Sequence, residues 1–301
     1  MSEPRNKRSW LSYGLTFVVL VALGYYIHNN ITEILNYDFQ FDWIAIILAF
    51  FAAVGGYLIM FSVWQKLAFS FGLEASSKVA GKAYYLSQLG KYIPGKVGLV
   101  LVRMDAYRGY SRKNVALATG VEYIASFISA CILILVATIF VDLHLPSYLR
   151  WLALGLLIAL LALLWPTVLK RVANFFFKLI KRQPVEKVPS FRKMLLIVFM
   201  YVIVGLFYGL CLFLVLNSLS PVGIQYYLAI TGTFWAAALI GIAVLFAPSG
   251  IGIREGVLML VLPAFVPEPT VIVGAILIRF VMITAELSLA CIFTVLVRKS
   301  R

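Results

Sequence analysis

Charged residues are scarce in this 301-residue chain: they make up 13% of it, whereas 63% of the residues are hydrophobic. A mean hydropathy of +0.98 excludes an ordinary soluble domain, whose surface needs far more charge. Acidic residues are the scarcer charged type, with 12 Asp and Glu against 26 Lys and Arg. The composition indicates an all-α polytopic membrane protein that forms a single transmembrane domain over residues 1–301.

Cysteine and histidine are also rare. The three cysteines, at positions 131, 211 and 291, lie in apolar runs and have neither the even count nor the spacing of a disulfide framework or a zinc site. We interpret them as packing residues. His28 and His144 stand alone near the ends of apolar runs. These scarcities predict no metal site, and we expect no cofactor.

Familiar catalytic motifs are missing. The sequence has no HExxH, no Gly-x-Ser-x-Gly and no Gly-x-x-x-x-Gly-Lys-Ser/Thr, which argues against ATP hydrolysis by this chain. A membrane enzyme would need a nucleophile or general base, for which Asp105, Glu122 and Glu255 are available. We expect no catalytic residues and no enzyme, and keep an integral membrane glycosyltransferase or headgroup transferase as the alternative.

The net charge of +14 does not indicate a nucleic acid partner, because a single topology places most basic residues on one side of a membrane. The positive-inside rule explains that bias. Basic residues at 5–8 and 298–301 place both termini in the cytoplasm, together with a basic loop at 170–193. We therefore expect a multi-pass protein of the cytoplasmic (inner) membrane.

Apolar runs predict about eight transmembrane helices. They cover about Trp10–Ile27, Trp43–Trp64, Val115–Val141, Tyr148–Leu169, Met194–Leu216, Tyr226–Phe246, Gly250–Phe265 and Val271–Val297. The seventh is the shortest, since roughly 15 residues reach only about 22 Å of a hydrocarbon core about 30 Å thick. A second hairpin there would put the basic carboxy terminus outside, so the charge rule favours a crossing.

One apolar stretch, residues 83–102, is predicted not to cross. It contains Lys91 and Lys96 beside the helix-breaking Pro94 and Gly95, and a crossing would place the basic loop outside. Broken backbone survives at bilayer depth only where protein or a water-filled cavity satisfies its polar groups. We expect a re-entrant segment around a polar pocket. An amphipathic segment lying flat at the interface is the alternative.

A second broken segment, residues 246–256, has a related pattern. Aligning Pro94 with Pro248 also aligns Gly98 with Gly252. Paired broken segments point to a transporter's substrate site and suggest an internal pseudo-repeat, although two unrelated loops remain the alternative. The predicted substrate-binding residues are Lys91, Tyr92, Pro94, Gly95, Lys96, Arg103, Pro248, Gly250, Gly252, Arg254 and Glu255.

Three ionisable residues lie inside apolar helices: Glu122, Arg279 and Glu286. Such residues are functional candidates by default, here for coupling or for lining a cavity. Arg279 and Glu286 are seven positions apart, about 10 Å along one helix face, so each should find its partner on another element or face the cavity. The alternative is that these three and Arg254 neutralise one another.

Aromatic residues near the first broken segment have two interpretations. Its tyrosines could bind a headgroup or lie at the membrane interface, and we favour the interface. Trp64 is likewise expected near a span end. These tyrosines are Tyr84, Tyr85, Tyr92, Tyr107 and Tyr110.

Four motifs resemble one known family. The segment Gly90–Lys96 resembles the GKYxPG signature of the lysylphosphatidylglycerol synthase transmembrane, or flippase-like, family. So do Val121–Tyr123, Pro248–Gly256 and Ile278–Phe280, in the same order along the chain. The resemblance covers essentially the whole sequence.

The resemblance implies a lipid transporter. Members of the family translocate aminoacylated phosphatidylglycerol, or stand alone in polyprenol-linked sugar or cell-envelope pathways. No aminoacyltransferase domain follows Arg301, so synthesis of lysyl-lipid is not implied. The expected partners are anionic phospholipids or polyprenyl-phosphate lipids. A non-transporting scaffold that binds a cytoplasmic glycosyltransferase or lipid-synthesis enzyme is a further alternative.

The expected mechanism follows from charge. Lys91, Lys96 and Arg254 would attract a phosphate, helped by backbone N–H groups at the ends of broken helices. Glu122 and Glu286 would meet a cationic group on the lipid or carry protons.

Overall fold

The computed structural model describes residues 19–92, 98–140, 147–179, 183–185, 188–244 and 250–298. All regular secondary structure in these ranges is helical, which confirms the all-α class. Residues 19–29 form the described part of the first apolar helix, and the short helix α2 (Ile31–Asn36) follows.

Five helices of the described part are long and apolar enough to cross a membrane. They are α3 (Trp43–Ser70), α6 (Arg112–Phe140), α9 (Phe191–Asn217), α10 (Tyr227–Ala243, preceded by the 3-10 turn η2 at Ile224–Tyr226) and α12 (Glu268–Arg298). Their apolar residues face either a shared core or the lipid, as expected for helices whose backbone bonds must all be made internally.

The expected span Tyr148–Leu169 is wrong at its carboxyl end. Helix α7 (Ser147–Leu163) stops earlier, and α8 (Pro166–Leu179) leaves it at an angle of 85°. Proline lacks the N–H and the space to continue a helix but is well suited to begin one. Counted as one broken span, the pair raises the number of candidates in the described chain from five to six.

Helix α8 also replaces the first part of the expected basic loop at 170–193. It carries Lys170, Arg171 and Lys178 together with the exposed rings of Phe175 and Phe176. A short helix with basic and aromatic side chains, turned sharply from its neighbour, is typical of an element that lies along a membrane surface.

The first broken segment forms a short helical hairpin. Helix α4 (Ser77–Leu89) ends in the 3-10 turn η1 (Gly90–Tyr92), and α5 (Gly98–Ala106) packs back against α4. A Cβ at Gly90 would lie 2.8 Å from the backbone of Gly98, so the two arms approach at a position that only glycine allows. We call this element the first hairpin.

The second broken segment forms a corresponding element from α10 and α11 (Ile253–Val261), which pack side by side. Gly252 is the N-cap of α11 just as Gly98 begins α5, so the aligned glycines both mark helix starts. The chain continues into the 3-10 turn η4 (Leu262–Ala264). We call this pair the second hairpin.

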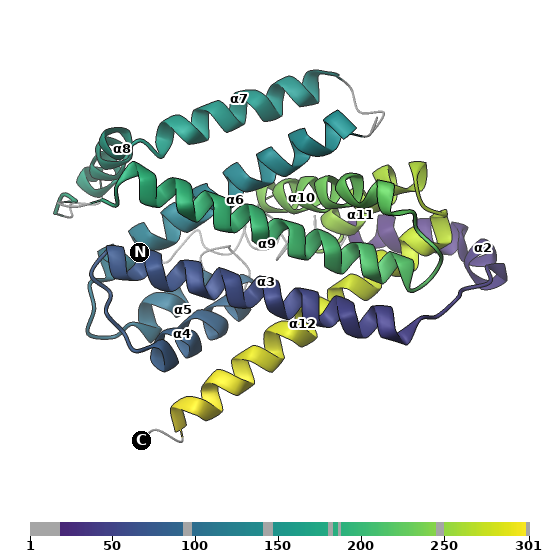
Figure 1. The fold of residues 1–301 in the computed structure, drawn as a ribbon, viewed down its shortest axis with the longest axis horizontal. Coiled ribbons are helices and arrows are strands. Elements are labelled where there is room, and N and C mark those ends of the chain that lie inside the picture. The colour runs from purple at the N-terminus through teal and green to yellow at the C-terminus, as the bar shows by residue number, and fades with distance from the viewer. Residues whose placement is uncertain are drawn as a thin grey trace, which may run out of the picture.

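The two hairpins open toward opposite ends of the molecule (Figure 1). At one end, the Tyr110 hydroxyl donates to the carbonyl of Glu74, which joins the loops that flank the first hairpin. At the other end, the rings of Tyr226 and Phe265 lie 5.5 Å apart, where the second hairpin begins and ends. The inner ends of their described parts, Lys91 in the first hairpin and residues 250–255 in the second, therefore lie near one another inside the helical bundle, and we call these residues the tips.

This arrangement does not support the expected seventh crossing at Gly250–Phe265. Helix α11 has nine residues. At 1.5 Å per residue it reaches about 14 Å, less than half of a hydrocarbon core. The predicted total of about eight spans is thus not confirmed.

The argument against a second hairpin, that it would place the basic carboxy terminus outside, is also wrong, because it took residues 250–265 as the whole hairpin. Because α10 and α11 form the hairpin together, the chain leaves it at the end where it entered. Helix α12 still runs toward the end that holds α4, α5 and α8 (Figure 1).

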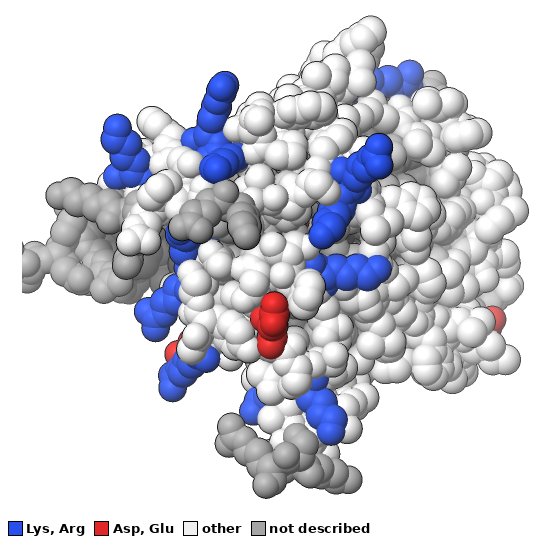
Figure 2. All heavy atoms as spheres, turned by 60° about the vertical axis from the view of Figure 1, so that its left-hand side comes forward, with Lys and Arg blue, Asp and Glu red and all other residues white. Residues whose placement is uncertain are grey.

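Basic side chains gather at this same end, as Figure 2 shows for the face that carries them. The sequence bias therefore corresponds to one end of the folded molecule. The helices at this end and the turn after α5 contribute Lys66, Lys78, Lys82, Arg108, Arg112, Lys113, Lys170, Arg171, Lys178, Arg192 and Lys193.

Candidate functional site

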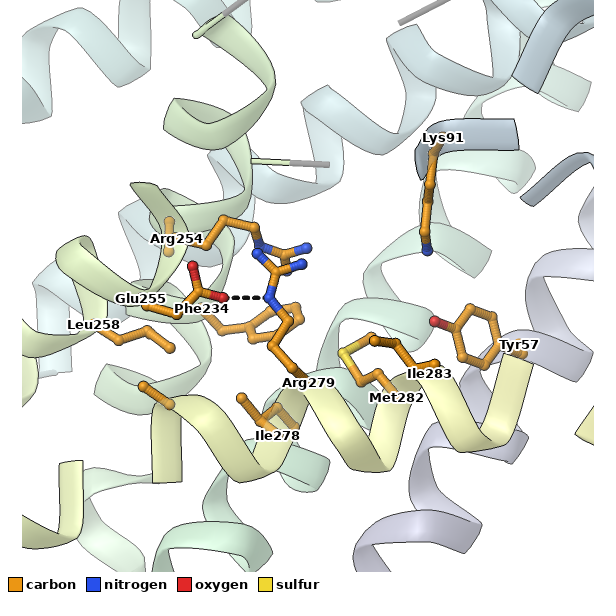
Figure 3. Close-up of a pocket in the computed structure, with 12 residues that line it drawn as sticks. Tyr57, Lys91, Phe234, Arg254, Glu255, Leu258, Ile278, Arg279, Met282 and Ile283 are labelled. Atoms are coloured by element: carbon orange, nitrogen blue, oxygen red, sulfur yellow. Dashed lines mark hydrogen bonds and ion pairs between the residues drawn. The ribbon is translucent and has the colours of Figure 1, made fainter. Parts of the chain in front are cut away.

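A polar cavity lies where the tips of the two hairpins meet. Lys91 reaches it from η1, Arg254 and Glu255 from the start of α11, and Arg279 from α12 (Figure 3). Tyr57 of α3 also lines it, with apolar residues between. Its volume is about 30 Å³, enough for a water molecule but well below the roughly 300–1,000 Å³ typical of small-molecule sites, so the surrounding elements must move apart before a headgroup can enter. We call it the hairpin cavity.

Two glycines shape the start of α11. Gly250 and Gly252 have φ angles of +67° and +82°, a region that strains other residues. The Gly252 N–H donates to Oε2 of Glu255 at 2.7 Å, which satisfies one of the free N–H groups at the helix start. The helix N-terminus thus points its partial positive charge toward the cavity.

Arg279 ties α12 to this tip. Its Nε donates to Oε1 of Glu255 in an ion pair, and its Nη2 donates to the carbonyl of Gly250 at 3.3 Å. Both partners are mostly buried. The interaction holds the start of α11 against α12.

Lys91 forms the corresponding link from the other tip. Its ammonium pairs with Glu286 of α12, and the Tyr57 hydroxyl donates to the same carboxylate oxygen at 2.6 Å. Glu286 is 1% exposed, whereas Lys91 is 29% exposed. The expectation that Arg279 and Glu286 bind partners on other elements, rather than each other, is confirmed.

The cavity region holds more positive than negative charge. Among the described residues, Lys91, Arg254 and Arg279 provide three cations, against the two carboxylates of Glu255 and Glu286. Like charges held together in a poorly hydrated space repel strongly. An anion between them would relieve this repulsion.

Arg254 lies on the opposite side of the cavity from Lys91 (Figure 3). Its guanidinium carbon is 5.2 Å from the centre of the Phe234 ring, a cation–π contact. A Cβ at Gly241 of α10 would lie 2.7 Å from Cγ of Arg254, so this glycine makes room for the side chain.

Arg103 and Glu122 form a separate buried ion pair between α5 and α6. Arg103 also donates from Nε to the Ser87 hydroxyl at 3.0 Å, and its guanidinium carbon lies 3.9 Å from the centre of the Trp64 ring. Glu122 accepts from the Tyr201 hydroxyl at 2.9 Å. Arg103, expected beside Lys91, therefore does not line the hairpin cavity.

The alternative of mutual neutralisation is wrong in its choice of partners. The described acids Glu122 and Glu286 pair with Arg103 and Lys91, and Arg279 pairs with Glu255. Charges do pair in the bundle, but they do so across different elements.

The interfacial interpretation of the aromatic residues is wrong for four of them. Trp64, Tyr84, Tyr85 and Tyr107 are buried, and Tyr110 is the one member of this group with a described side chain that keeps a place at the basic end. Three of these residues surround Arg103: the Trp64 and Tyr84 rings face its guanidinium, and Trp64 Nε1 donates to the Tyr107 hydroxyl at 2.9 Å.

Tyr57 and Tyr201 were not predicted as site residues. A tyrosine in the middle of an apolar helix was the available signal, because its buried hydroxyl needs a partner.

The four predicted residues Pro94, Gly95, Lys96 and Pro248 lie outside the described ranges, as does the Tyr92 side chain.

Two further cavities adjoin the hairpin cavity. A linking cavity shares Lys91 and Arg254 with it and is also lined by Gln88, Tyr123 and Gly241. An apolar groove lies on the other face of α11, between Ile253–Leu260 and the helical segment 19–29. In the described ranges, no cluster of His, Cys, Asp and Glu could hold a metal ion.

Comparison with known proteins agrees with the motifs. The family model described as the lysylphosphatidylglycerol synthase transmembrane region matches residues 10–287. A search among curated proteins finds no significant match. Since the family model spans nearly all of the sequence, the chain belongs to the lysylphosphatidylglycerol synthase transmembrane region family.

Proposed function

We propose that this protein is a lipid flippase that moves an anionic headgroup across the cytoplasmic membrane. The observation that carries the proposal is the cluster of Lys91, Arg254 and Arg279 around one cavity between the tips of two broken hairpins. A phosphate there would accept charge-assisted hydrogen bonds, which are stronger than neutral ones. The N-terminus of α11 would add its dipole.

The arrangement of the hairpins supports transport. Each hairpin opens toward a different end of the molecule (Figure 1). The cavity is lined by Lys91 of the first hairpin and by Arg254 and Glu255 of the second. Relative movement of the tips would expose Lys91 and Arg254 to one side and then the other, as in transporters that rock around a central site. The positive-inside rule assigns the basic end to the cytoplasm.

The apolar groove beside α11 supports a lipid as the substrate. One face of α11 turns Arg254 and Glu255 to the hairpin cavity, and the other turns Gly256 and Leu260 to the groove. Leu260 is 82% exposed. A single helix thus separates a polar from an apolar space, which fits a headgroup on one side and its hydrocarbon chain on the other.

Filling the groove should slow transport. At Gly256 an added Cβ would meet no atom within 4 Å, so Gly256→Leu should fold normally. Its side chain would displace part of the lipid chain, at about 0.8 kcal/mol for each lost methylene contact. We expect translocation of phosphatidylglycerol in proteoliposomes to fall about 10-fold.

Gly120→Leu is the matched control for this prediction. Gly120 is exposed on α6 and has equally open space around its Cβ. It should transport at the wild-type rate. Equal rates for Gly256→Leu and Gly120→Leu would remove the groove from the mechanism.

The charge of the cavity predicts which lipids move. Glu255 and Glu286 are each engaged by a cation of the protein, so they offer little to a cationic headgroup. We expect phosphatidylglycerol to cross at least about 10-fold faster than its lysyl form, which carries a net positive charge. A polyprenyl-phosphate sugar should also be accepted.

Leaflet translocation of these three labelled lipids tests the proposal directly. Protein-free vesicles of the same composition give the background rate. No movement above this background by correctly inserted protein would overturn the flippase assignment and favour a transferase or a scaffold. Faster movement of the lysyl lipid would contradict the anionic preference.

A further inference from the structure

A large cavity lies at the basic end of the molecule, where α3 ends and where α4 and α9 begin. Its volume is about 620 Å³, within the range of about 300–1,000 Å³ typical of small-molecule sites. Lys66 of α3, Ser77 of α4 and Lys193 of α9 line it. Among the described residues, it shares none with the hairpin cavity. We call it the basic-end cavity.

The two helices that begin at this cavity leave their positive ends uncompensated. Their N-cap residues are Ser76 for α4 and Ser190 for α9, and neither side chain caps its helix. The first turn of each helix holds no acid and instead carries a lysine, Lys78 in α4 and Lys193 in α9. Cations are unfavourable there, because the free N–H groups already carry partial positive charge. An anion in the cavity would stabilise both helix starts.

Several side chains of the cavity can donate to an anion. The Lys66 ammonium makes a weak contact at 3.9 Å with the Met200 sulfur, and Lys193 has no ion pair within the described ranges. Tyr107 is 2% exposed, and its hydroxyl accepts one hydrogen bond and can still donate its own proton. Glu74 is the one acid in the described lining, and it is exposed to water. The two lysines therefore outweigh the negative charge.

The wall of this cavity continues onto the lipid-facing surface of the bundle. Phe69 of α3 and Leu196 of α9 line it and are 66% and 51% exposed. The positive-inside rule places this end at the cytoplasmic leaflet, where basic residues attract anionic lipids. A soluble anion would use only the lysines and the helix starts. A lipid would also cover the two apolar side chains with its hydrocarbon.

We propose that the basic-end cavity binds an anionic phospholipid of the cytoplasmic leaflet as a resident ligand that is not transported. Its phosphate lies between Lys66, Lys193 and the start of α4, and thereby joins three helices. The inference stands apart from the proposed function, because the two cavities have separate described linings. The bound lipid holds the outer end of the first hairpin against α3 and α9, while the tip at Lys91 is left to move.

Thermal unfolding in detergent micelles tests this site. We expect dioleoyl phosphatidylglycerol to raise the Tm of the wild-type protein by about 5 °C more than dioleoyl phosphatidylcholine does, as for a ligand well above its Kd. In Lys66→Gln/Lys193→Gln most of this difference should be lost, whereas Arg254→Met should keep most of it. If Arg254→Met abolishes the difference and the lysine variant keeps it, the lipid binds at the hairpin cavity alone and the basic-end site is wrong.

Arg112→Gln/Arg171→Gln is the matched control. It removes the same two positive charges from exposed residues of α6 and α8 that lie outside the cavity. It should keep the wild-type difference, and an equal loss in both double variants would reduce the effect to general attraction by the basic end and overturn the site. Glycerol phosphate in place of the lipid should give no shift. A full shift with it would overturn the lipid assignment in favour of a soluble phosphate.

Discussion

Arg254→Met is expected to slow translocation of phosphatidylglycerol by about 100-fold. The substitution removes one of three cations at the hairpin cavity and leaves the two ion pairs of the cavity intact. A hydrogen bond between charged groups is worth about 1.5–3 kcal/mol, and each 1.4 kcal/mol is a factor of ten. Translocation rates at equal reconstituted protein provide the measurement.

Arg108→Met is the control for Arg254→Met. Arg108 is 79% exposed and pairs with Asp105 three residues earlier, an interaction that contributes little in water. Its loss should leave the rate within about twofold of wild type. Wild-type transport by Arg254→Met would show that the phosphate does not bind at the tip of α11.

Lys91 is less suitable for the same experiment, because its partner Glu286 is 1% exposed. Lys91→Ala would leave that carboxylate buried without its cation, and the resulting loss of stability would mix with a loss of binding. The structure thus separates two residues that the sequence treated alike. Because Glu286 would stay buried without its cation, Lys91→Ala reports on the fold as well as on the ligand.

The sequence was sufficient for five long helices and for the two broken segments. Long apolar runs predicted α3, α6, α9, α10 and α12, because length and hydropathy are local properties. The aligned glycines Gly98 and Gly252 both lie at helix starts, which the alignment itself did not predict.

The pairing of charges could not be predicted in the same way. Lys91 and Glu286 are separated by 195 positions, and their contact depends on how the first hairpin packs against α12. Helical periodicity restricts which residues share a face of one helix, but it says nothing of the neighbouring helix. It could therefore exclude an Arg279–Glu286 pair without identifying the true partners.

The bend at Pro166 and the burial of Trp64 were missed for a related reason. Hydropathy does not distinguish a span that continues from one that stops at a proline. The residues before Pro166 and those after it, such as Leu163 and Leu169, are both apolar. A tryptophan near a span end is usually interfacial. Here the Arg103 guanidinium lies over its ring and brings it into the core.

Breaking the Arg103–Glu122 pair should have the largest effect on stability. Both side chains are nearly inaccessible, at 0% and 8% exposure. Removing one partner of such a pair leaves a buried charge and costs about 3–5 kcal/mol. We expect Arg103→Met to lower the unfolding free energy by this amount, measured by denaturation in detergent micelles.

The double variant Arg103→Met/Glu122→Gln separates pairing from packing. It removes both charges while keeping side chains of similar size, so it should recover most of the lost stability, because a buried ion pair adds little beyond its own desolvation cost. The exposed pair of Arg108 and Asp105 is the control: Arg108→Met should cost less than about 1 kcal/mol. A double variant no more stable than Arg103→Met would show that contacts of Arg103 with Trp64 and Ser87, rather than its charge pairing, hold α5 in place. In either case the contacts of Arg103 that stabilise the fold lie outside the hairpin cavity, so these variants leave the cations of that cavity unchanged.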